Sequence, residues 1–263
     1  MFGVVIGLAC FALGGGVYAK DGNDAEGVPP SGRIVGGQDA DIRDHPHMLL
    51  LHKDGEAICG AVVIGSNYAI TAAHCVYPLL DLRTFTLHGG STTQLGMNTT
   101  FYASSVHIHP KYDDPSLDND VAIIGINGTF TGHPNITAIP LQNTDPIISS
   151  SRPTDCYTTG WGVKNRKMRT IPNRLQIGYL QLVPSRTCRI QWYPNAITPS
   201  MICAQGDSTD ACSGDSGGPL VCDGRLYGTV SWGTRECNGS RAAVFAKIPA
   251  TTIRSFISAI TGI

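Results

Sequence analysis

Short apolar runs, rich in β-branched residues and bounded by turn residues, recur along most of the chain. Examples are AVVIGS (61–66), VAIIGI (121–126) and LYGTVSW (226–232). Runs of this length between glycine, proline, asparagine and serine predict strands rather than helices. With Gly 31 and Pro 16 among 263 residues, the pattern favours an all-β sandwich or barrel.

The last residues follow a different period. In TTIRSFISAITGI (251–263), the apolar positions Ile253, Phe256, Ile257 and Ile260 are spaced i, i+3, i+4 and i+7. This spacing places them on one face of a helix. We therefore expect one amphipathic α-helix at the C-terminus.

The first 19 residues are uncharged and mostly apolar, and Val17 and Ala19 provide the small residues of a signal-peptidase site before Lys20. We interpret residues 1–19 as a secretory signal peptide. A positively charged start is missing and the apolar stretch is long, so a membrane anchor stays open as an alternative. Five glycines within the stretch argue against a membrane span.

Residues 20–33 are polar, rich in glycine and proline, and without periodicity, which is typical of a flexible segment. The sequence RIVGGQDA (33–40) then begins abruptly. It is either a linker that meets a first strand or a processing site. Cleavage after Arg33 would free an α-amino group on Ile34, and this new cation could pair with a buried carboxylate.

Cysteine usage indicates an oxidising compartment. Of 9 cysteines, Cys10 lies in the signal segment, which leaves an even number in the mature chain. Eight cysteines permit 105 pairings, so the sequence alone predicts a disulfide framework without choosing one. Four glycosylation sequons, at Asn98, Asn127, Asn135 and Asn238, predict a secreted glycoprotein.

Charge excludes some partners. Without the two basic and three acidic residues of positions 1–33, the 19 basic and 20 acidic residues become 17 of each. Such a balance implies no bulk attraction to nucleic acid or membrane. The basic run KNRKMR (164–169) is a solvated loop, a self-cleavage loop or an exosite for an acidic partner. The His-x-His pairs at 45–47 and 107–109 lack a third ligand at suitable spacing, so we expect no metal site.

Three separated segments carry residues for nucleophilic catalysis. His74 lies in TAAHC (71–75), Asp120 in NDVAII (119–124) and Ser216 in GDSGGP (214–219). A serine hydroxyl is a weak nucleophile unless a histidine removes its proton, and a carboxylate fixes the histidine's tautomer. These three side chains are therefore the candidate catalytic residues.

Together with RIVGG, GWG (160–162) and SWG (231–233), these segments resemble the chymotrypsin/trypsin-type serine endopeptidases, over about residues 33–263. The resemblance implies two six-stranded antiparallel β-barrels with the active site between them and a C-terminal α-helix. It divides the chain into a signal peptide (1–19), an activation propeptide (20–33) and a peptidase domain (34–263). The barrel halves would span about 34–140 and 150–250.

The same resemblance assigns the residues around Ser216. The backbone amides of Gly214 and Ser216 would form the oxyanion hole, which stabilises negative charge on the substrate carbonyl oxygen. Asp215 would receive the Ile34 ammonium after cleavage at Arg33, and would then order the oxyanion loop.

The resemblance also implies a specificity pocket. Asp210 would lie at its base and select Lys or Arg, while Ser231, Trp232 and Gly233 would form a wall that pairs with the substrate backbone. Ala243 stands where trypsins carry glycine. Because the guanidinium is wider than an ammonium, we expect its methyl group to disfavour Arg substrates more than Lys substrates.

The implied disulfides are Cys59–Cys75, Cys156–Cys222, Cys188–Cys203 and Cys212–Cys237. Pancreatic-type trypsins bind calcium through a loop of the first barrel, but the corresponding residues 87–102 contain no carboxylate. We expect no calcium there, since calcium needs several oxygen ligands, preferably charged. No other cofactor is expected.

These implications together predict a secreted zymogen that becomes a trypsin-like endopeptidase after cleavage at Arg33. It would act as a monomer on protein or peptide substrates, with an activating protease and proteinaceous inhibitors as further partners. A non-catalytic binding module on the same fold is one alternative. Chymotrypsin-like or elastase-like specificity is another, which Asp210 disfavours. The physiological substrate and role are not encoded in these motifs.

Overall fold

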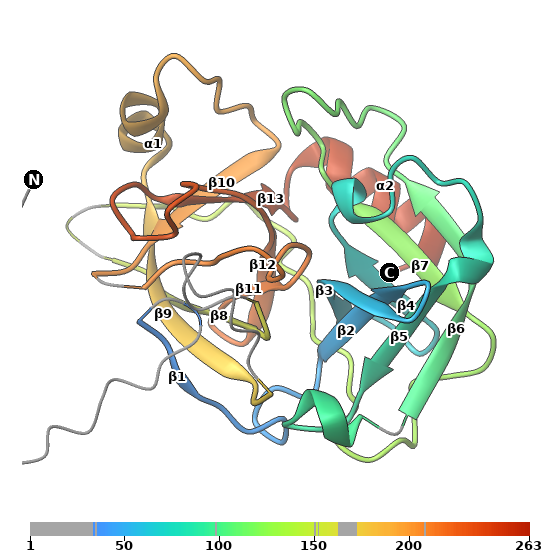
Figure 1. The fold of residues 1–263 in the computed structure, drawn as a ribbon. Helices are drawn as coiled ribbons and strands as arrows, with labels where there is room; N and C mark the ends of the chain where they lie inside the picture. The colour runs from blue at the N-terminus through green and yellow to red at the C-terminus, as the bar shows by residue number, and fades with distance from the viewer. Residues whose placement is uncertain are drawn as a thin grey trace, which may run out of the picture.

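Two closed β-barrels pack side by side in the computed structural model, with a helix behind them (Figure 1). The structure describes residues 34, 36–97, 99–149, 151, 153–162, 173–207 and 209–263. The predicted fold class is confirmed. The predicted signal segment, the propeptide with Arg33, the Asn98 sequon and the basic run 164–169 lie outside the described residues.

The first barrel is a closed antiparallel sheet in the order β2-β3-β4-β7-β6-β5. Alternate side chains along its strands fill a core that includes Leu49, Phe85 and Ile124. The strands are β2 (Met48–Lys53), β3 (Glu56–Val63), β4 (Tyr68–Thr71), β5 (Phe85–Gly89), β6 (Thr99–Ile108) and β7 (Ala122–Ile126). Three short 3-10 helices lie in its loops: η1 (Ala73–Cys75), η2 (Leu82–Thr84) and η3 (Gln94–Gly96).

The second barrel closes through a pairing between β8 and β9, and β1 adds to the outer edge of β9. Its core includes Leu220, Val230 and Phe245. The strands are β8 (Asp155–Gly160), β9 (Gln176–Val183), β10 (Met201–Gln205), β11 (Pro219–Cys222), β12 (Arg225–Trp232) and β13 (Ala243–Lys247), with β1 at Gln38–Asp39.

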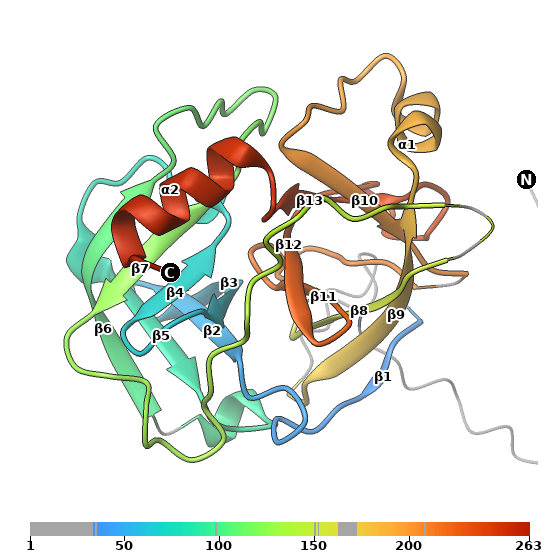
Figure 2. The same cartoon turned by 180° about the vertical axis from the view of Figure 1, so that it is seen from behind.

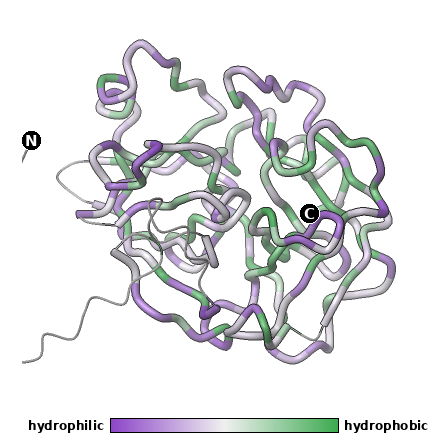
Figure 3. The backbone as a smooth tube through the Cα atoms, viewed as in Figure 1, coloured by the Kyte–Doolittle hydropathy of each residue, from purple (hydrophilic) through white to green (hydrophobic). Residues whose placement is uncertain are grey.

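A third apolar layer joins the barrels to the C-terminal helix α2 (Thr251–Thr261). Ile253 and Ile257 are fully buried in this layer, with Phe256 and Ile260 partly buried against it, so the helical face predicted from their spacing is confirmed. Figure 2 shows α2 crossing the back of the first barrel. The hydropathy of the chain follows this architecture, with hydrophilic stretches in the peripheral loops (Figure 3).

Helix α1 (Ser185–Trp192) was not predicted. Its sequence SRTCRIQW buries only Cys188 and Trp192, one turn apart, so it has no extended apolar stripe. The Cys188–Cys203 disulfide attaches it to β10, and long-range constraints of this kind leave no helical period in the sequence. Among the described residues, no helix is both long and apolar enough to cross a membrane.

Candidate functional site

His74 lies on the short helix η1, which directly follows β4. The Cys59–Cys75 disulfide ties this helix to β3, so the position of the histidine is constrained by its covalent neighbour. Its side chain is 25% exposed, so the ring is partly accessible to solvent. The local sequence TAAHC therefore places a fixed imidazole at the end of a barrel strand.

Asp120 lies two residues before the start of β7 and is almost completely buried. Its Oδ2 lies 2.8 Å from His74 Nδ1, and its Oδ1 accepts from the His74 amide at 3.0 Å. Ser231 Oγ also donates to Oδ2, at 2.5 Å. Because a carboxylate oxygen only accepts, the ring proton of His74 lies on Nδ1, and Nε2 is left with a lone pair that can take up a proton.

Ser216 lies in the turn before β11 and borders the same cavity as Ser231. Its carbonyl accepts from the Gly60 amide at 2.8 Å, next to the cysteine that is bonded to Cys75. Its successor Gly217 is so close to Thr71 and Ala72 that a Cβ there would lie 2.9 Å from the Ala72 amide nitrogen. Within the described part of the chain, no hydrogen bond joins the Ser216 hydroxyl to His74. Such bonds are commonly loose before substrate binds.

The amides of Gly214 and Ser216 are available as donors. The neighbouring amides already donate to backbone carbonyls: Asp215 N donates to Cys212 O at 2.9 Å, and Gly217 N donates to Val230 O at 2.8 Å. Neither Gly214 N nor Ser216 N takes part in any of the hydrogen bonds between described residues. Gly214 has φ +95°, and a Cβ there would lie 3.1 Å from Gly162 Cα, so glycine is required.

Asp215 is fully buried beneath this turn. Its carboxylate accepts from Gly162 N at 2.9 Å and from Cys212 N at 3.0 Å. A Cβ at Gly160 or Gly162 would overlap the carboxylate, which explains why the GWG segment has glycine on both sides of its tryptophan. Burial raises the pKa of Asp215 to about 7, although the hydrogen bonds from Cys212 N and Gly162 N act in the opposite direction.

Ile34 is fully buried. A Cβ on Gly178 of β9 would lie 2.8 Å from Ile34 Cγ2. Gly178 pairs with Thr158 of β8, two residues before Gly160, which packs on Asp215. The structure therefore places Ile34 and Asp215 in the same region of the second barrel.

The raised pKa of Asp215 predicts that the uncleaved chain loses stability as pH rises from about 4 to 7. The folded state holds the proton more tightly than the unfolded state, so stability is fully present below the unfolded pKa and is lost as pH passes the folded value. His47 has a pKa that burial lowers to about 4, so its effect on the pH dependence of stability has the opposite sign.

Urea unfolding of an Arg33→Gln precursor should therefore be compared with the same protein carrying Asp215→Asn. The free energy of unfolding of the Asp215→Asn protein, relative to that of the Arg33→Gln precursor, should rise by on the order of a few kcal/mol between pH 4 and pH 8. A difference in the free energy of unfolding between the two proteins that does not change with pH would contradict the raised pKa of Asp215.

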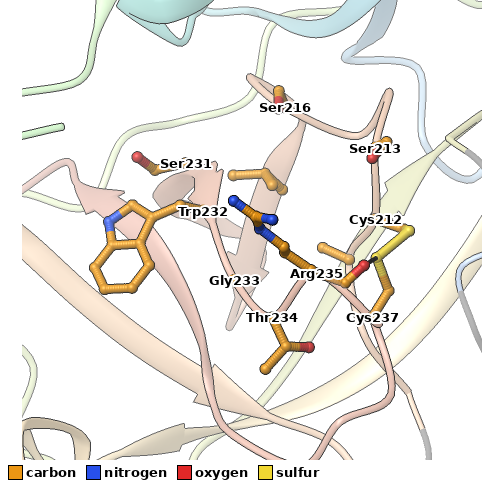
Figure 4. A pocket seen from close by; sticks show the side chains of 11 residues that line it. Cys212, Ser213, Ser216, Ser231, Trp232, Gly233, Thr234, Arg235 and Cys237 are labelled. Atoms are coloured by element: carbon orange, nitrogen blue, oxygen red, sulfur yellow. Dashed lines mark hydrogen bonds between the residues drawn. A yellow bond between two sulfur atoms is a disulfide. The ribbon is translucent and has the colours of Figure 1, made fainter. Parts of the chain in front are cut away.

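A cavity of about 200 Å³ opens beside Ser216. Its wall includes Ser231, Trp232, Gly233, Thr234 and Arg235, and Figure 4 shows the Arg235 side chain extending into the space between them. The cavity's position next to Ser216 suits the side chain of a bound peptide. Ala211 and the Cys212–Cys237 disulfide complete the opposite side.

Asp210 and Ala243 lie behind this wall rather than in it. Asp210 is 2% exposed, and its Oδ2 accepts from Gly239 N at 3.1 Å and Thr234 Oγ1 at 3.3 Å. Burial raises its pKa, and these hydrogen bonds partly offset that effect. Ala243 is 3% exposed on β13, with its Cα 3.9 Å from where a Cβ of Gly233 would be.

Comparisons with known proteins agree with this geometry. The model of the family described as Trypsin matches residues 34–257. Trypsin delta of Drosophila melanogaster is 34% identical over 260 residues, which covers 97% of both chains. The chain belongs to the trypsin family. Hypodermin-A of Hypoderma lineatum is 33% identical over 86% of each chain. The structure of neuropsin, a serine protease expressed in the limbic system of mouse brain, aligns with a TM-score of 0.74 and 27% identity, covering 84% of this chain and 98% of that chain.

This trypsin-family protein is a trypsin-like serine endopeptidase, a hydrolase that acts on protein or peptide substrates. The structure contains the four disulfides that the resemblance implied, and they join η1 to β3, β8 to β11, α1 to β10, and the Asp210 loop to the segment after Trp232. The cluster of Cys59, His74 and Cys75 has the geometry of a metal site. Its two sulfurs are bonded to each other, so it cannot supply thiolate ligands.

Sequence reasoning about this trypsin-family chain missed several supporting contacts. Asn119, directly before Asp120, has φ 52° and donates its amide to Ser200 Oγ at 3.1 Å. Its Oδ1 accepts from Thr252 Oγ1 of α2 at 2.7 Å. These bonds connect the Asp120 turn to the second barrel and the terminal helix. An asparagine before a buried aspartate is a signal for a left-handed turn, but its partners are distant in sequence.

Proposed function

We propose that this protein is a secreted serine endopeptidase, made as a zymogen, that hydrolyses peptide bonds after Lys or Arg. The observation that carries the proposal is the buried carboxylate of Asp120, which is bonded to both His74 and Ser231 beside the cavity that Ser216 borders. A carboxylate, an imidazole and a hydroxyl arranged in this way generate a nucleophile at neutral pH.

In the proposed mechanism, His74 Nε2 takes the proton of Ser216 as the hydroxyl oxygen attacks the scissile carbonyl carbon. Asp120 holds the Nδ1–H tautomer and stabilises the imidazolium that forms. His74 then donates the proton to the leaving amine, which releases the first product and leaves an acyl-enzyme. Water, deprotonated by the same imidazole, attacks the acyl group and restores Ser216.

The amides of Gly214 and Ser216 support the same mechanism, because both are free of other hydrogen bonds within the described part of the chain. Negative charge develops on the carbonyl oxygen in the tetrahedral intermediate, and donors already in place stabilise it without reorganisation. Losing one such donor typically lowers the rate by about 10²–10³-fold.

Activation is proposed to follow cleavage after Arg33. The new ammonium of Ile34 would pair with Asp215 and compensate for the burial of its carboxylate. The buried position of Ile34 near Gly178 supports this step. The four disulfides support secretion, since such bonds persist in oxidising compartments.

Specificity for Lys or Arg is proposed from Asp210, which lies behind the cavity wall and places negative charge there. The test is a cleavage-site profile of a peptide library after controlled cleavage at Arg33. We expect Lys or Arg before the scissile bond and no cleavage by Ser216→Ala. Cleavage after aromatic or small residues would contradict the specificity, and cleavage by Ser216→Ala would contradict the mechanism.

Ala243 should bias this specificity toward Lys. We propose that its methyl group, behind Gly233 of the wall, restricts the path toward Asp210, and a guanidinium is wider than an ammonium. We expect Ala243→Gly to raise kcat/KM on Arg peptides relative to matched Lys peptides by about tenfold, at the lower end of what one methyl group changes. A wild-type protein with a strong Arg preference, or a variant with an unchanged ratio, would contradict this role.

A further inference from the structure

Asn119, which directly precedes Asp120, has a hydrogen-bond partner for each polar atom of its backbone and side chain. The partners are Ser200 Oγ for its amide at 3.1 Å, Val121 N for its carbonyl at 2.8 Å, Lys111 O for Nδ2 at 3.2 Å and Thr252 Oγ1 for Oδ1 at 2.7 Å. Asn119 is 5% exposed and has φ 52°, a left-handed conformation that asparagine tolerates. Because Asp120 is the next residue, these partners also set the direction in which Asp120 leaves the turn.

Ser200 is the partner that the second barrel holds most firmly. It is 5% exposed and lies just before β10, and its carbonyl accepts from Lys247 N of β13 at 2.7 Å. Its hydroxyl donates to the Asp118 carboxylate, to which Thr198 Oγ1 also donates at 2.6 Å. Because a carboxylate oxygen only accepts, the hydroxyl proton of Ser200 points to Asp118, and a lone pair of Ser200 Oγ faces the Asn119 amide.

This hydroxyl connects the two barrels close to the candidate catalytic residues. Figure 1 and Figure 2 show the segment before β10 and the segment before β7 on the same side of the molecule, where the barrels face each other. Ser231 of β12 donates to Asp120 Oδ2 at 2.5 Å, so two hydroxyls of the second barrel hold the carboxylate and the residue before it. Ser216 also belongs to the second barrel, whereas His74 belongs to the first. The placement of the His74–Asp120 pair relative to Ser216 therefore depends on these bonds.

We propose that Ser200 is a positioning residue for the chemical step, whose hydroxyl fixes the peptide plane before Asn119 and so keeps the Asp120 carboxylate aligned with His74. This inference rests on the proposed catalytic roles of His74, Asp120 and Ser216. Without the hydroxyl, the buried Asn119 amide loses its acceptor, and a buried donor without a partner is unfavourable. The turn then relaxes toward another acceptor, and Asp120 moves with it.

The effect belongs to kcat and not to KM. Ser200 is not among the described residues that line the cavity beside Ser216, so its loss leaves the substrate contacts in place. The Asp120 carboxylate, by contrast, accepts from His74 Nδ1 at 2.8 Å and from His74 N at 3.0 Å. Small losses of alignment between groups that transfer a proton lower the rate of the chemical step. A serine that only stabilised the fold would change the unfolding temperature and leave kcat per active site unchanged.

The experiment uses the full chain after cleavage at Arg33. Ser200→Ala removes the hydroxyl, and Ser200→Thr keeps it. Thr252→Val removes the hydroxyl of α2 that donates to the side chain of Asn119, and this variant leaves the second barrel untouched. It decides the matter if Ser200→Ala does not fold.

Ser91→Ala is the matched control. The Ser91 hydroxyl also has both a donor and an acceptor role, since it donates to Thr93 O at 2.9 Å and accepts from Thr93 N at 3.1 Å, in a loop of the first barrel. Active-site titration gives the concentration of competent protein, and hydrolysis of a Lys peptide gives kcat and KM. Proton NMR of the hydrogen bond between His74 Nδ1 and Asp120 reports on the alignment directly, and thermal unfolding reports on the fold.

We expect Ser200→Ala to lower kcat by about tenfold, the rate equivalent of one hydrogen bond, with KM within twofold of the wild-type value. The downfield NMR signal of the His74 Nδ1 proton should move upfield or broaden. Ser200→Thr should restore kcat to within about threefold of the wild type, and Thr252→Val should lower it by about threefold. Ser91→Ala should leave kcat, KM and the NMR signal unchanged.

A folded Ser200→Ala protein with wild-type kcat and an unchanged NMR signal would overturn the positioning role, and the proposed function would stand because the wild type still cleaves the Lys peptide. A loss in Ser91→Ala equal to that in Ser200→Ala would overturn it too, as would a loss in Ser200→Thr as large as in Ser200→Ala. If Ser200→Ala does not fold, wild-type kcat and NMR signal in Thr252→Val would overturn it. A processed wild type that cleaves no peptide would contradict the proposed function itself.

Discussion

Asp120→Asn should lower kcat by about 10⁴-fold while leaving the fold intact. This is the loss known for the same change in a serine-protease triad of this family. The carboxylate accepts from His74 Nδ1 at 2.8 Å and from Ser231 Oγ at 2.5 Å. An amide NH₂ turned toward the ring would favour the tautomer with its proton on Nε2, which cannot accept the serine proton. Steady-state hydrolysis of a Lys peptide after active-site titration measures the effect.

Asp145→Asn provides the matched control, because Asp145 is a largely exposed carboxylate whose only described ion pair is with Lys247 at 3.0 Å. Because the Asp145 carboxylate is 68% exposed, its ion pair contributes little to stability, so the variant should retain wild-type activity. Thermal unfolding of both variants separates loss of chemistry from loss of fold. A loss below about tenfold in a folded Asp120→Asn protein would contradict the role given to this carboxylate.

Cleavage after Arg33 should raise kcat/KM by at least 10²–10³-fold, and Asp215→Asn should remove most of that gain. Asp215 holds the turn that presents the Gly214 and Ser216 amides, through its bonds to Gly162 N and Cys212 N. Without a cation nearby the charged form of this buried carboxylate is disfavoured, so at neutral pH the precursor should hold this turn less firmly than the processed protein does. The expected loss of kcat/KM is the loss caused by removing at least one hydrogen-bond donor of the oxyanion hole.

The comparison requires three proteins: the processed wild type, the processed Asp215→Asn variant and an Arg33→Gln precursor that cannot be cleaved at this site. Chemical acetylation of the Ile34 amine in the processed protein should mimic the precursor, since it removes the charge without changing the sequence. A precursor as active as the processed protein, or an acetylated protein with full activity, would show that activation does not depend on this ammonium.

The fold was predictable because its signals are local. Apolar runs such as 121–126 alternate with turn residues, and the spacing of Ile253 and Ile257 marks a helical face. Helix α1 was not predictable because it lacks an apolar stripe. A disulfide and two buried side chains fix its position instead. The closure of each barrel could be expected only through the resemblance, since strand order depends on pairings distant in sequence.

The catalytic segments were predictable for a related reason. The glycines of GDSGGP and GWG meet strict steric requirements, such as φ +95° at Gly214 and the contact of Gly162 with Asp215, so their spacing is recognisable. The partners of Asp210 and the direction of the Arg235 side chain were not predictable. Both depend on how the segment after Trp232 folds back across the cavity, and TRE (234–236) carries no signal for it.

Covalent labelling of Ser216 tests the central claim most directly. A fluorophosphonate reacts with a serine only where a base takes its proton and amides stabilise the phosphoryl oxygen. After cleavage at Arg33, we expect one label per chain, located on Ser216 by mass spectrometry, and no label in His74→Ala. An unlabelled Ser216 in the folded, processed protein, or equal labelling in His74→Ala, would contradict the account and favour a binding module on a protease fold.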